Sequence, residues 1–152
     1  IASEIAKRLG GHHRLMHLPD QLDEHAMAEM RKLSEITETL ELLQRADVVL
    51  YGIGRADDMG LKRQLPQEVL TRVLKNGAVA EAYGCYFDGD GGVVFSASTV
   101  AHDLGKLKPD CAMLAVAAGA RKAGAIRAVM RSRPQAMLVT DEGAARAMLA
   151  QK

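Results

Sequence analysis

The chain has 152 residues, 48% of them hydrophobic, and a formal net charge of +1, which predicts a single domain that buries roughly two thirds of its unfolded surface. Acidic and basic residues are interspersed, and there is no tryptophan, with three tyrosines and two phenylalanines, so the sequence lacks the basic stripe and the stacking side chains of a nucleic-acid-binding surface. No apolar run approaches the roughly 20 residues of a membrane span and no signal-peptide pattern opens the chain, so we expect a cytoplasmic protein without a membrane partner.

The first third of the chain is predicted to be mainly helical. Ile5, Ala6 and Leu9 have the spacing of a helix over 3–9, and Gly10-Gly11 suits its C-cap. Because this helix is already under way at residue 1, we expect a strand and its loop to precede it. The next expected elements are a strand over 13–18 closed by Pro19 and helices over 23–30 and 35–46.

A glycine turn with two cations beyond it is the most informative local pattern. The apolar run at 48–52 is typical of a buried strand, and Gly52 and Gly54 allow backbone N–H groups to approach a ligand closely. Lys62 and Arg63 follow, where an ammonium and a guanidinium can reach the same phosphate. The pattern therefore predicts an anion-binding site.

The second half of the chain repeats the order strand, turn, helix. The glycine-rich acidic segment 88–92 between two β-rich segments is strong hairpin chemistry. The expected elements are a helix over 66–74 ended by Asn76-Gly77, hairpin strands over 84–87 and 93–96, strands over 112–117 and 136–139, and helices over about 121–131 and from Thr140 or Asp141 to Leu149. This alternation predicts an α/β fold with a mostly parallel sheet and one β-hairpin, with ligands beyond the carboxyl ends of the strands.

Further candidate site residues follow the later strands. Gly119 offers a turn with backbone donors, and Arg121 and Lys122 add positive charge for an anion; alternatively, the glycine only makes the turn and both cations are solvated. Asp141 either binds sugar hydroxyls or caps the last helix. Glu81, in an apolar setting, either holds hydroxyl groups or is a solvent-facing carboxylate at a helix end.

No metal, cofactor or catalytic residue is predicted. Four histidines between residues 12 and 25 lack the spacing of metal ligands, and the 88–92 turn lacks the length and terminal glutamate of a calcium loop. The 52–54 turn lacks the third glycine of a dinucleotide fingerprint. Cys85 and Cys111 lack ligand spacing and are expected to be ordinary thiols without a structural disulfide.

Five segments in this order resemble the effector-binding domain of SorC/DeoR-type sugar-responsive bacterial transcription regulators. They are 51–54, 59–63, 80–88, 114–119 together with Lys122, and 139–145. The resemblance implies a Rossmann-like three-layer domain related to sugar-phosphate isomerases and CoA-transferase-like folds. It further implies a phosphorylated sugar as effector, fructose bisphosphate in the glycolytic branch, and a homodimer or homotetramer. DNA would be bound only by a separate N-terminal helix-turn-helix, which is not in this chain.

The resemblance also assigns roles to individual residues. The family's basic effector contact maps onto Lys62 with Arg63 beside it, its sugar-binding carboxylate onto Glu81, and its later lysine onto Lys122. Lys62 departs from the arginine of the glycolytic branch, which keeps the charge but loses the bidentate fork. The turn at 118–121 is less polar than the family pattern, so it offers fewer hydroxyl groups.

The family's phosphate-binding glycine/threonine loop would precede residue 1. We therefore expect this segment by itself to bind its effector weakly or in an altered manner. A sugar-phosphate isomerase or deaminase on the same fold is the alternative function, in which Glu81, Asp141 or a histidine would act as acid or base. No compact catalytic signature accompanies these residues, and we therefore expect a sensor domain and not an enzyme.

Overall fold

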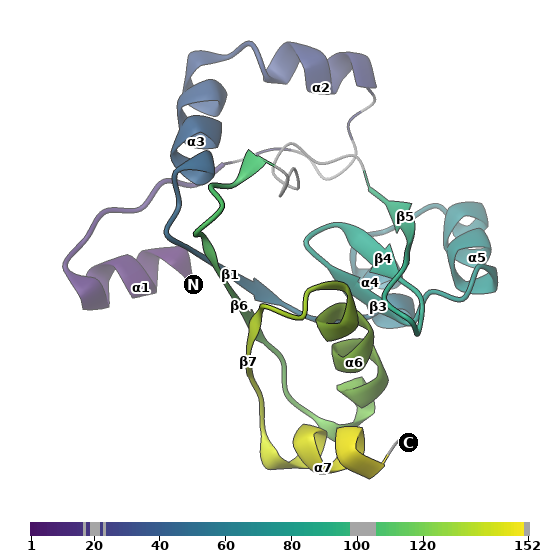
Figure 1. Cartoon of the computed structure of the whole chain (residues 1–152). Coiled ribbons are helices and arrows are strands. Elements are labelled where there is room, and N and C mark those ends of the chain that lie inside the picture. The colour runs from purple at the N-terminus through teal and green to yellow at the C-terminus, as the bar shows by residue number, and fades with distance from the viewer. Residues whose placement is uncertain (17, 19–21, 23, 98–105, 151–152) are drawn as a thin grey trace.

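The strands form two sheets in the computed structural model, which describes residues 1–16, 18, 22, 24–97 and 106–150 (Figure 1). The helices are α1 (Ala2–Leu9), α2 (Glu24–Met30), α3 (Ser34–Gln44), α4 (Ala56–Lys62), α5 (Gln67–Lys75), the short 3₁₀ helix η2 (Ala120–Lys122), α6 (Ala123–Ser132) and α7 (Glu142–Ala150). The strands are β1 (Val48–Gly52), β2 (Gly54–Arg55), β3 (Ala80–Ala82), β4 (Cys85–Phe87), β5 (Val93–Ser96), β6 (Ala112–Val116) and β7 (Met137–Val139). The predicted α/β class is confirmed.

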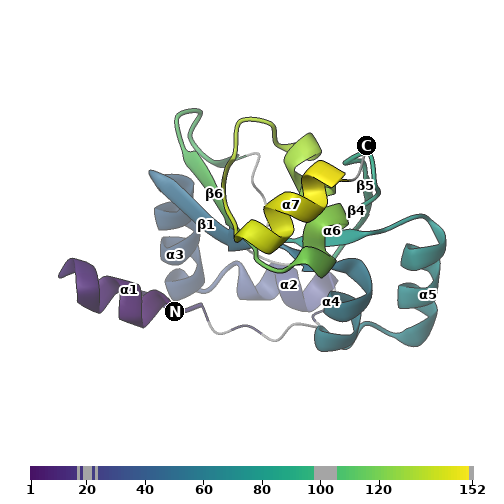
Figure 2. The same ribbon diagram turned by 90° about the horizontal axis from the view of Figure 1, so that it is seen from below.

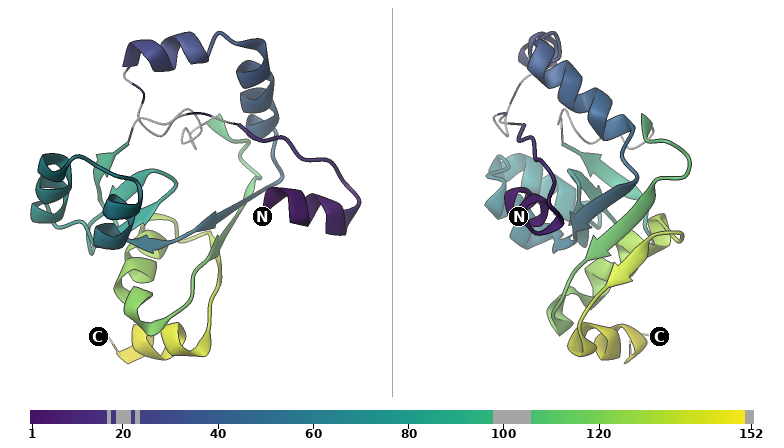
Figure 3. Two further views of the ribbon diagram at one scale, coloured as in Figure 1. Left: turned by 180° about the vertical axis from the view of Figure 1, so that it is seen from behind. Right: turned by 90° about the vertical axis from the view of Figure 1, so that its left-hand side faces the viewer.

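The parallel sheet has the strand order β1-β6-β7. Val48 pairs with Ala112 at one end of β1 and Gly52 pairs with Val116 at the other, so the carboxyl ends of the strands lie at one edge. Helices α6 and α7 lie on one side of this sheet (Figure 3, right). Alternate residues of β1 face away from α6, and among these Val48 and Leu50 are about half exposed. One face of the sheet is therefore apolar and open in this chain.

The antiparallel sheet has the order β2-β3-β4-β5 and is larger than the predicted hairpin. The hairpin β4-β5 is confirmed, and Asp88 at its turn accepts backbone hydrogen bonds from Asp90 and Gly92. Strands β2 and β3 were not predicted. The turn from β3 to β4 consists of Tyr83 and Gly84, both in the left-handed region with φ of 44° and 86°, as a two-residue type I′ hairpin turn requires.

Helix α6 packs between the two sheets. Its alanines allow close approach, and Ala128, Ile126 and Val129 are completely buried. The surrounding core draws on both sheets and on α7: Tyr51, Ile53, Ala80, Ala82, Phe87, Ala115, Ala117, Ala125 and Ala144. This shared core holds the parallel and antiparallel sheets against one another.

Two elements of the first half of the chain differ from the prediction. The expected strand over 13–18 is wrong, because its described residues, 13–16 and 18, form no strand. Met16 and Leu18 instead pack against Met27 of α2 and Ile36 of α3, so a hydrophobic contact with helices replaces pairing with a strand. The helices predicted over 3–9, 23–30 and 35–46 are confirmed within one to two residues at their described ends.

Helix α4 was not predicted, because Gly60 lies in its middle and glycine is a poor helix former. Gly60 has a packing role that the sequence alone did not reveal. A Cβ atom at this position would lie 2.3 Å from Cδ1 of Leu70 in α5. The absence of a side chain therefore allows α4 and α5 to pack directly against each other (Figure 1).

Candidate functional site

The turns that follow β1, β6 and β7 meet at the carboxyl edge of the parallel sheet, as the sequence predicts for a ligand site. They hold the predicted residues Gly52, Gly54, Gly119 and Asp141. Helix α7 begins at this edge and lies in front of the sheet when the molecule is seen from below (Figure 2). We refer to the turns at 52–54, 117–122 and 140–141 as the carboxyl-edge site.

Lys122 joins two of these turns. Its side chain is half-buried, and its ammonium group donates a hydrogen bond to the carbonyl oxygen of Ile53, at 3.0 Å. Ile53 is itself buried between Gly52 and Gly54. Because an ammonium group has three donors, this hydrogen bond holds the charge at the glycine turn and leaves further N–H groups for an anion.

Asp141 joins the turn at 140–141 to the turn at 117–122. Its Oδ1 accepts hydrogen bonds from the backbone N–H of Gly119, at 3.0 Å, and from that of Ala144, at 2.9 Å. The contact with Ala144 is that of an N-cap of α7, which bears out the capping alternative. The hydrogen bond from Gly119, followed by that from Ala144, lowers the pKa of Asp141. The Gly119 N–H is therefore already engaged by a carboxylate in the same chain.

Glu81 is buried beside the glycine turn. It lies in β3 directly opposite Gly54 of β2, and its side chain is only 2% exposed. Oε1 accepts a hydrogen bond from the backbone N–H of Gly84, at 2.8 Å, and lies 3.0 Å from NH2 of Arg63. The alternative that placed Glu81 at a solvent-facing helix end is therefore wrong, because the side chain is enclosed and ion-paired.

The four predicted cations lie in four different settings. Arg63 pairs with Glu81 and is 32% exposed, whereas Lys62, the last residue of α4, is exposed. Arg121 diverges from Lys122 and lines a cavity of about 440 Å³ between β2, α5 and α6, together with Arg55 and Asp57. Within that cavity, an ion pair with Arg55 lowers the pKa of Asp57. The turn at 117–122 thus carries both cations, but the Lys122 side chain reaches the glycine turn whereas Arg121 lines this separate cavity.

Two buried polar groups beside the site lack a hydrogen-bond partner in the described part of the chain, which the sequence could not show. Within the described residues, the hydroxyl of Thr140 and Nε of Arg63 are enclosed and have no hydrogen-bond partner. Thr140 immediately precedes Asp141 at the carboxyl edge, and Arg63 contacts the buried carboxylate. Unpaired buried donors are costly and therefore rare in proteins. A sequence signal existed for Thr140, since a polar residue directly after a parallel strand lies at the ligand edge of the sheet.

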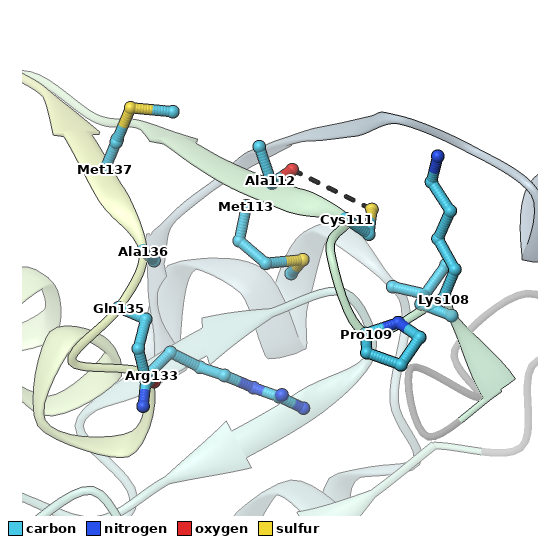
Figure 4. A pocket seen from close by; sticks show the side chains of 10 residues that line it. Lys108, Pro109, Cys111, Ala112, Met113, Arg133, Gln135, Ala136 and Met137 are labelled. Atoms are coloured by element: carbon cyan, nitrogen blue, oxygen red, sulfur yellow. Dashed lines mark hydrogen bonds between the residues drawn. The ribbon is translucent and has the colours of Figure 1, made fainter.

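A cavity of about 540 Å³ lies at the opposite edge, where β6 and β7 begin (Figure 4). Its lining includes Lys108, Met113 and Arg133, and Figure 4 shows the Arg133 side chain extended below Met113. None of the predicted site residues lines it. In the described part of the chain there is no cluster of three His, Cys, Asp or Glu side chains suited to a metal ion, and no helix long and apolar enough to cross a bilayer.

Residues 1–150 match the protein family described as "Putative sugar-binding domain". Two proteins named "Central glycolytic genes regulator", from Priestia megaterium and Bacillus subtilis, are 39% and 36% identical to the chain over 149 residues. These matches cover 98% of the chain and 44% of each relative, so the chain spans less than half the length of these curated relatives.

A solved structure supports the same assignment. The crystal structure described as a "putative SorC family transcriptional regulator", from Enterococcus faecalis, has a TM-score of 0.88 and 33% sequence identity to the chain. The match covers 97% of the chain and 60% of that structure. The resemblance drawn from the five sequence segments is confirmed, and the chain belongs to this family of sugar-binding domains.

Proposed function

We propose that the chain is the effector-binding domain of a sugar-responsive bacterial transcription regulator and binds a phosphorylated sugar at the carboxyl-edge site. The observation that supports this most directly is the pair of hydrogen bonds that tie the three turns together, from Lys122 to Ile53 and from Gly119 to Asp141. They hold the edge in place and fix a half-buried cation on it, which favours the binding of an anion such as phosphate.

Two kinds of contact recognise the effector in this proposal. Lys122 and the exposed Lys62 bind phosphate through charge-assisted hydrogen bonds. The carboxylate of Glu81 accepts hydrogen bonds from sugar hydroxyl groups, and Gly52 and Gly54 allow the sugar to approach the backbone. Fructose bisphosphate is the favoured effector, because the two curated relatives are named as regulators of central glycolytic genes.

The response to the effector follows from linkage. A ligand that binds one assembly of the regulator more tightly than another shifts the population toward the first. We propose that the domain acts within a cytoplasmic homodimer or homotetramer, and that a separate N-terminal domain contacts the DNA. Effector binding then changes DNA affinity by reciprocal coupling, without any contact between this domain and the operator.

A thermal-shift screen tests the proposal. The 152-residue chain and the full-length protein that carries it are melted with fructose bisphosphate, glucose phosphate, dihydroxyacetone phosphate and deoxyribose phosphate, with unphosphorylated fructose as the control. A ligand at 100 times its Kd stabilises the folded state by about 2.7 kcal/mol. A rise in Tm with one sugar phosphate and not with fructose is expected. No shift of the full-length protein with any of the four contradicts the proposal.

Calorimetry on the same two proteins tests the extent of the site. We expect the 152-residue chain to bind the selected sugar phosphate more weakly than the full-length protein does, because the resemblance places a phosphate-binding loop before residue 1. Equal affinities would show that residues 1–152 contain the whole site. Chemical conversion of the sugar phosphate during the same incubation, followed by NMR, would favour an isomerase or deaminase instead.

A further inference from the structure

Lys62 and Arg63 are adjacent in the sequence, but their side chains have different surroundings. Lys62 is exposed at the end of α4, whereas Arg63 lies 3.0 Å from Oε1 of Glu81. Glu81 is 2% exposed, and an ionised carboxylate buried to this extent requires a partner of opposite charge. The positive charge of Arg63 is thus used within the chain, and it adds little net charge for a phosphate.

The two groups that contact Glu81 act on the same oxygen atom. Arg63 approaches Oε1 from the end of α4, and the backbone N–H of Gly84 approaches it from the β3–β4 turn. A carboxylate has about four acceptor positions on two oxygen atoms. With Oε1 contacted from two elements, the orientation of the carboxylate is restricted.

We propose that Arg63 is a positioning residue that acts on the effector through Glu81 and makes no contact with phosphate. It holds the carboxylate in its orientation, so that Oε2 accepts hydrogen bonds from hydroxyl groups of the sugar. The two adjacent cations therefore have separate tasks: Lys62 recognises phosphate, and Arg63 supports recognition of the hydroxyl groups. This inference rests on the proposed function.

The test compares two ligands that share their phosphates and differ in their hydroxyl groups. Fructose 1,6-bisphosphate carries both kinds of group, whereas hexane-1,6-diol bisphosphate carries two phosphates on a plain alkyl chain. Affinities are measured by calorimetry on the full-length protein. Arg63→Ala is expected to weaken fructose bisphosphate binding by about tenfold or more, as expected for loss of charge-assisted contacts. Binding of the diol bisphosphate should change by less than about twofold, whereas Lys62→Ala should weaken both ligands.

Three further variants separate positioning from general structural damage. Arg55→Ala removes another ion-paired arginine, 30% exposed against 32% for Arg63, and should leave the ratio of the two affinities unchanged. Arg63→Lys keeps a cation beside Glu81 and should restore part of the selectivity for fructose bisphosphate over the diol bisphosphate. This variant also provides the test if Arg63→Ala does not fold. In a Glu81→Gln background, Arg63→Ala should cause no additional loss of selectivity, because the group it positions is already altered.

Equal losses for both ligands in Arg63→Ala and Arg63→Lys would overturn the positioning role and make Arg63 a phosphate contact. That result would leave the proposed function intact, since the wild-type protein still binds the sugar phosphate. A wild-type full-length protein that binds neither fructose bisphosphate nor any other sugar phosphate in the screen would overturn the proposed function, and the positioning role with it.

Discussion

The ammonium group of Lys122 lies 3.0 Å from the carbonyl oxygen of Ile53, a residue 69 positions earlier in the chain. This hydrogen bond connects the start of α6 with the glycine turn after β1, and so joins two of the three turns of the carboxyl-edge site. Lys62, by contrast, extends from the end of α4 and is exposed. The two lysines proposed to bind phosphate should therefore respond differently to truncation.

Lys62→Ala should weaken binding of the sugar phosphate by about tenfold, corresponding to roughly 1.4 kcal/mol, and leave the free energy of unfolding unchanged, because exposed cations contribute little to stability. Lys122→Ala should weaken binding and also lower the free energy of unfolding by about 1 to 2 kcal/mol, since a hydrogen bond from a charged donor is lost. Calorimetry and urea denaturation measure the two effects. Unchanged affinity in both variants would remove these lysines from the site.

Asp141 should make the stability of the domain depend on pH. Hydrogen bonds from Gly119 and Ala144 hold its pKa below the ordinary value of 3.8. The stabilisation is therefore fully present above pH 3.8 and is lost as the pH falls through the lower pKa of the folded state. Asp141→Asn keeps an acceptor for both N–H groups but removes the titration.

Urea denaturation across the acidic range measures this dependence. The wild-type protein should lose stability more steeply than Asp141→Asn as the pH falls below 3.8, and Asp141→Ala should be less stable than either at neutral pH. If the free energy of unfolding falls equally with pH in the wild type and in Asp141→Asn, the charge of the carboxylate does not contribute to the stability that the cap provides.

Gly91 should be much less tolerant of substitution than Gly89 in the same hairpin turn. A Cβ atom on Gly91 would lie 2.8 Å from the carbonyl oxygen of Ala128 and from the backbone nitrogen of Ser132, and the residue has a φ of +90°. Neither backbone atom can move without disturbing α6. Gly91→Ala should therefore lower the free energy of unfolding by about 2 kcal/mol or more.

Gly89→Ala is the matched control, because a Cβ atom there would meet no atom within 4 Å. It should change stability by no more than about 0.5 kcal/mol. If both variants melt at the same temperature, the contact between the hairpin turn and α6 does not contribute to stability.

Thr140 should contribute to binding and not to stability. Its hydroxyl is enclosed without a hydrogen-bond partner among the described residues. Replacing such a group with an apolar group of the same shape is close to neutral or stabilising, so Thr140→Val should melt at or above the wild-type temperature. If the effector supplies the missing partner, Thr140→Val should weaken binding, whereas Thr140→Ser should not. A marked loss of stability in Thr140→Val would reveal a partner in the free protein.

The elements with strong periodicity were predictable from the sequence. Strand β6 and helix α6 follow from a continuous apolar run and an alanine-rich amphipathic segment, and β5 was predicted with its observed bounds. Strands β2 and β3 are two and three residues long, too short for a period-two pattern to appear. Their pairing depends on partners distant in the sequence, which local propensity does not contain.

The candidate site was predictable in position but not in its contacts. The turns after β1, β6 and β7 follow from the rule for the carboxyl ends of parallel strands. The pairing of Arg63 with Glu81 and that of Asp141 with Gly119 depend on three-dimensional packing. A sequence shows two adjacent cations as equivalent, and only the fold reveals that one of them already has an anionic partner.

The tight β3–β4 turn has a consequence for the order in which the site forms during folding. Glu81 and Gly84 are three residues apart, so their hydrogen bond closes within a short hairpin, an event of about 1 to 10 μs. Lys122 and Ile53 are 69 residues apart in the sequence, and non-local contacts of this kind form slowly during folding. We expect the hairpin geometry around the carboxylate to form early and the carboxyl-edge site to assemble late, so a nascent chain would acquire the proposed hydroxyl-binding part before the proposed phosphate-binding part.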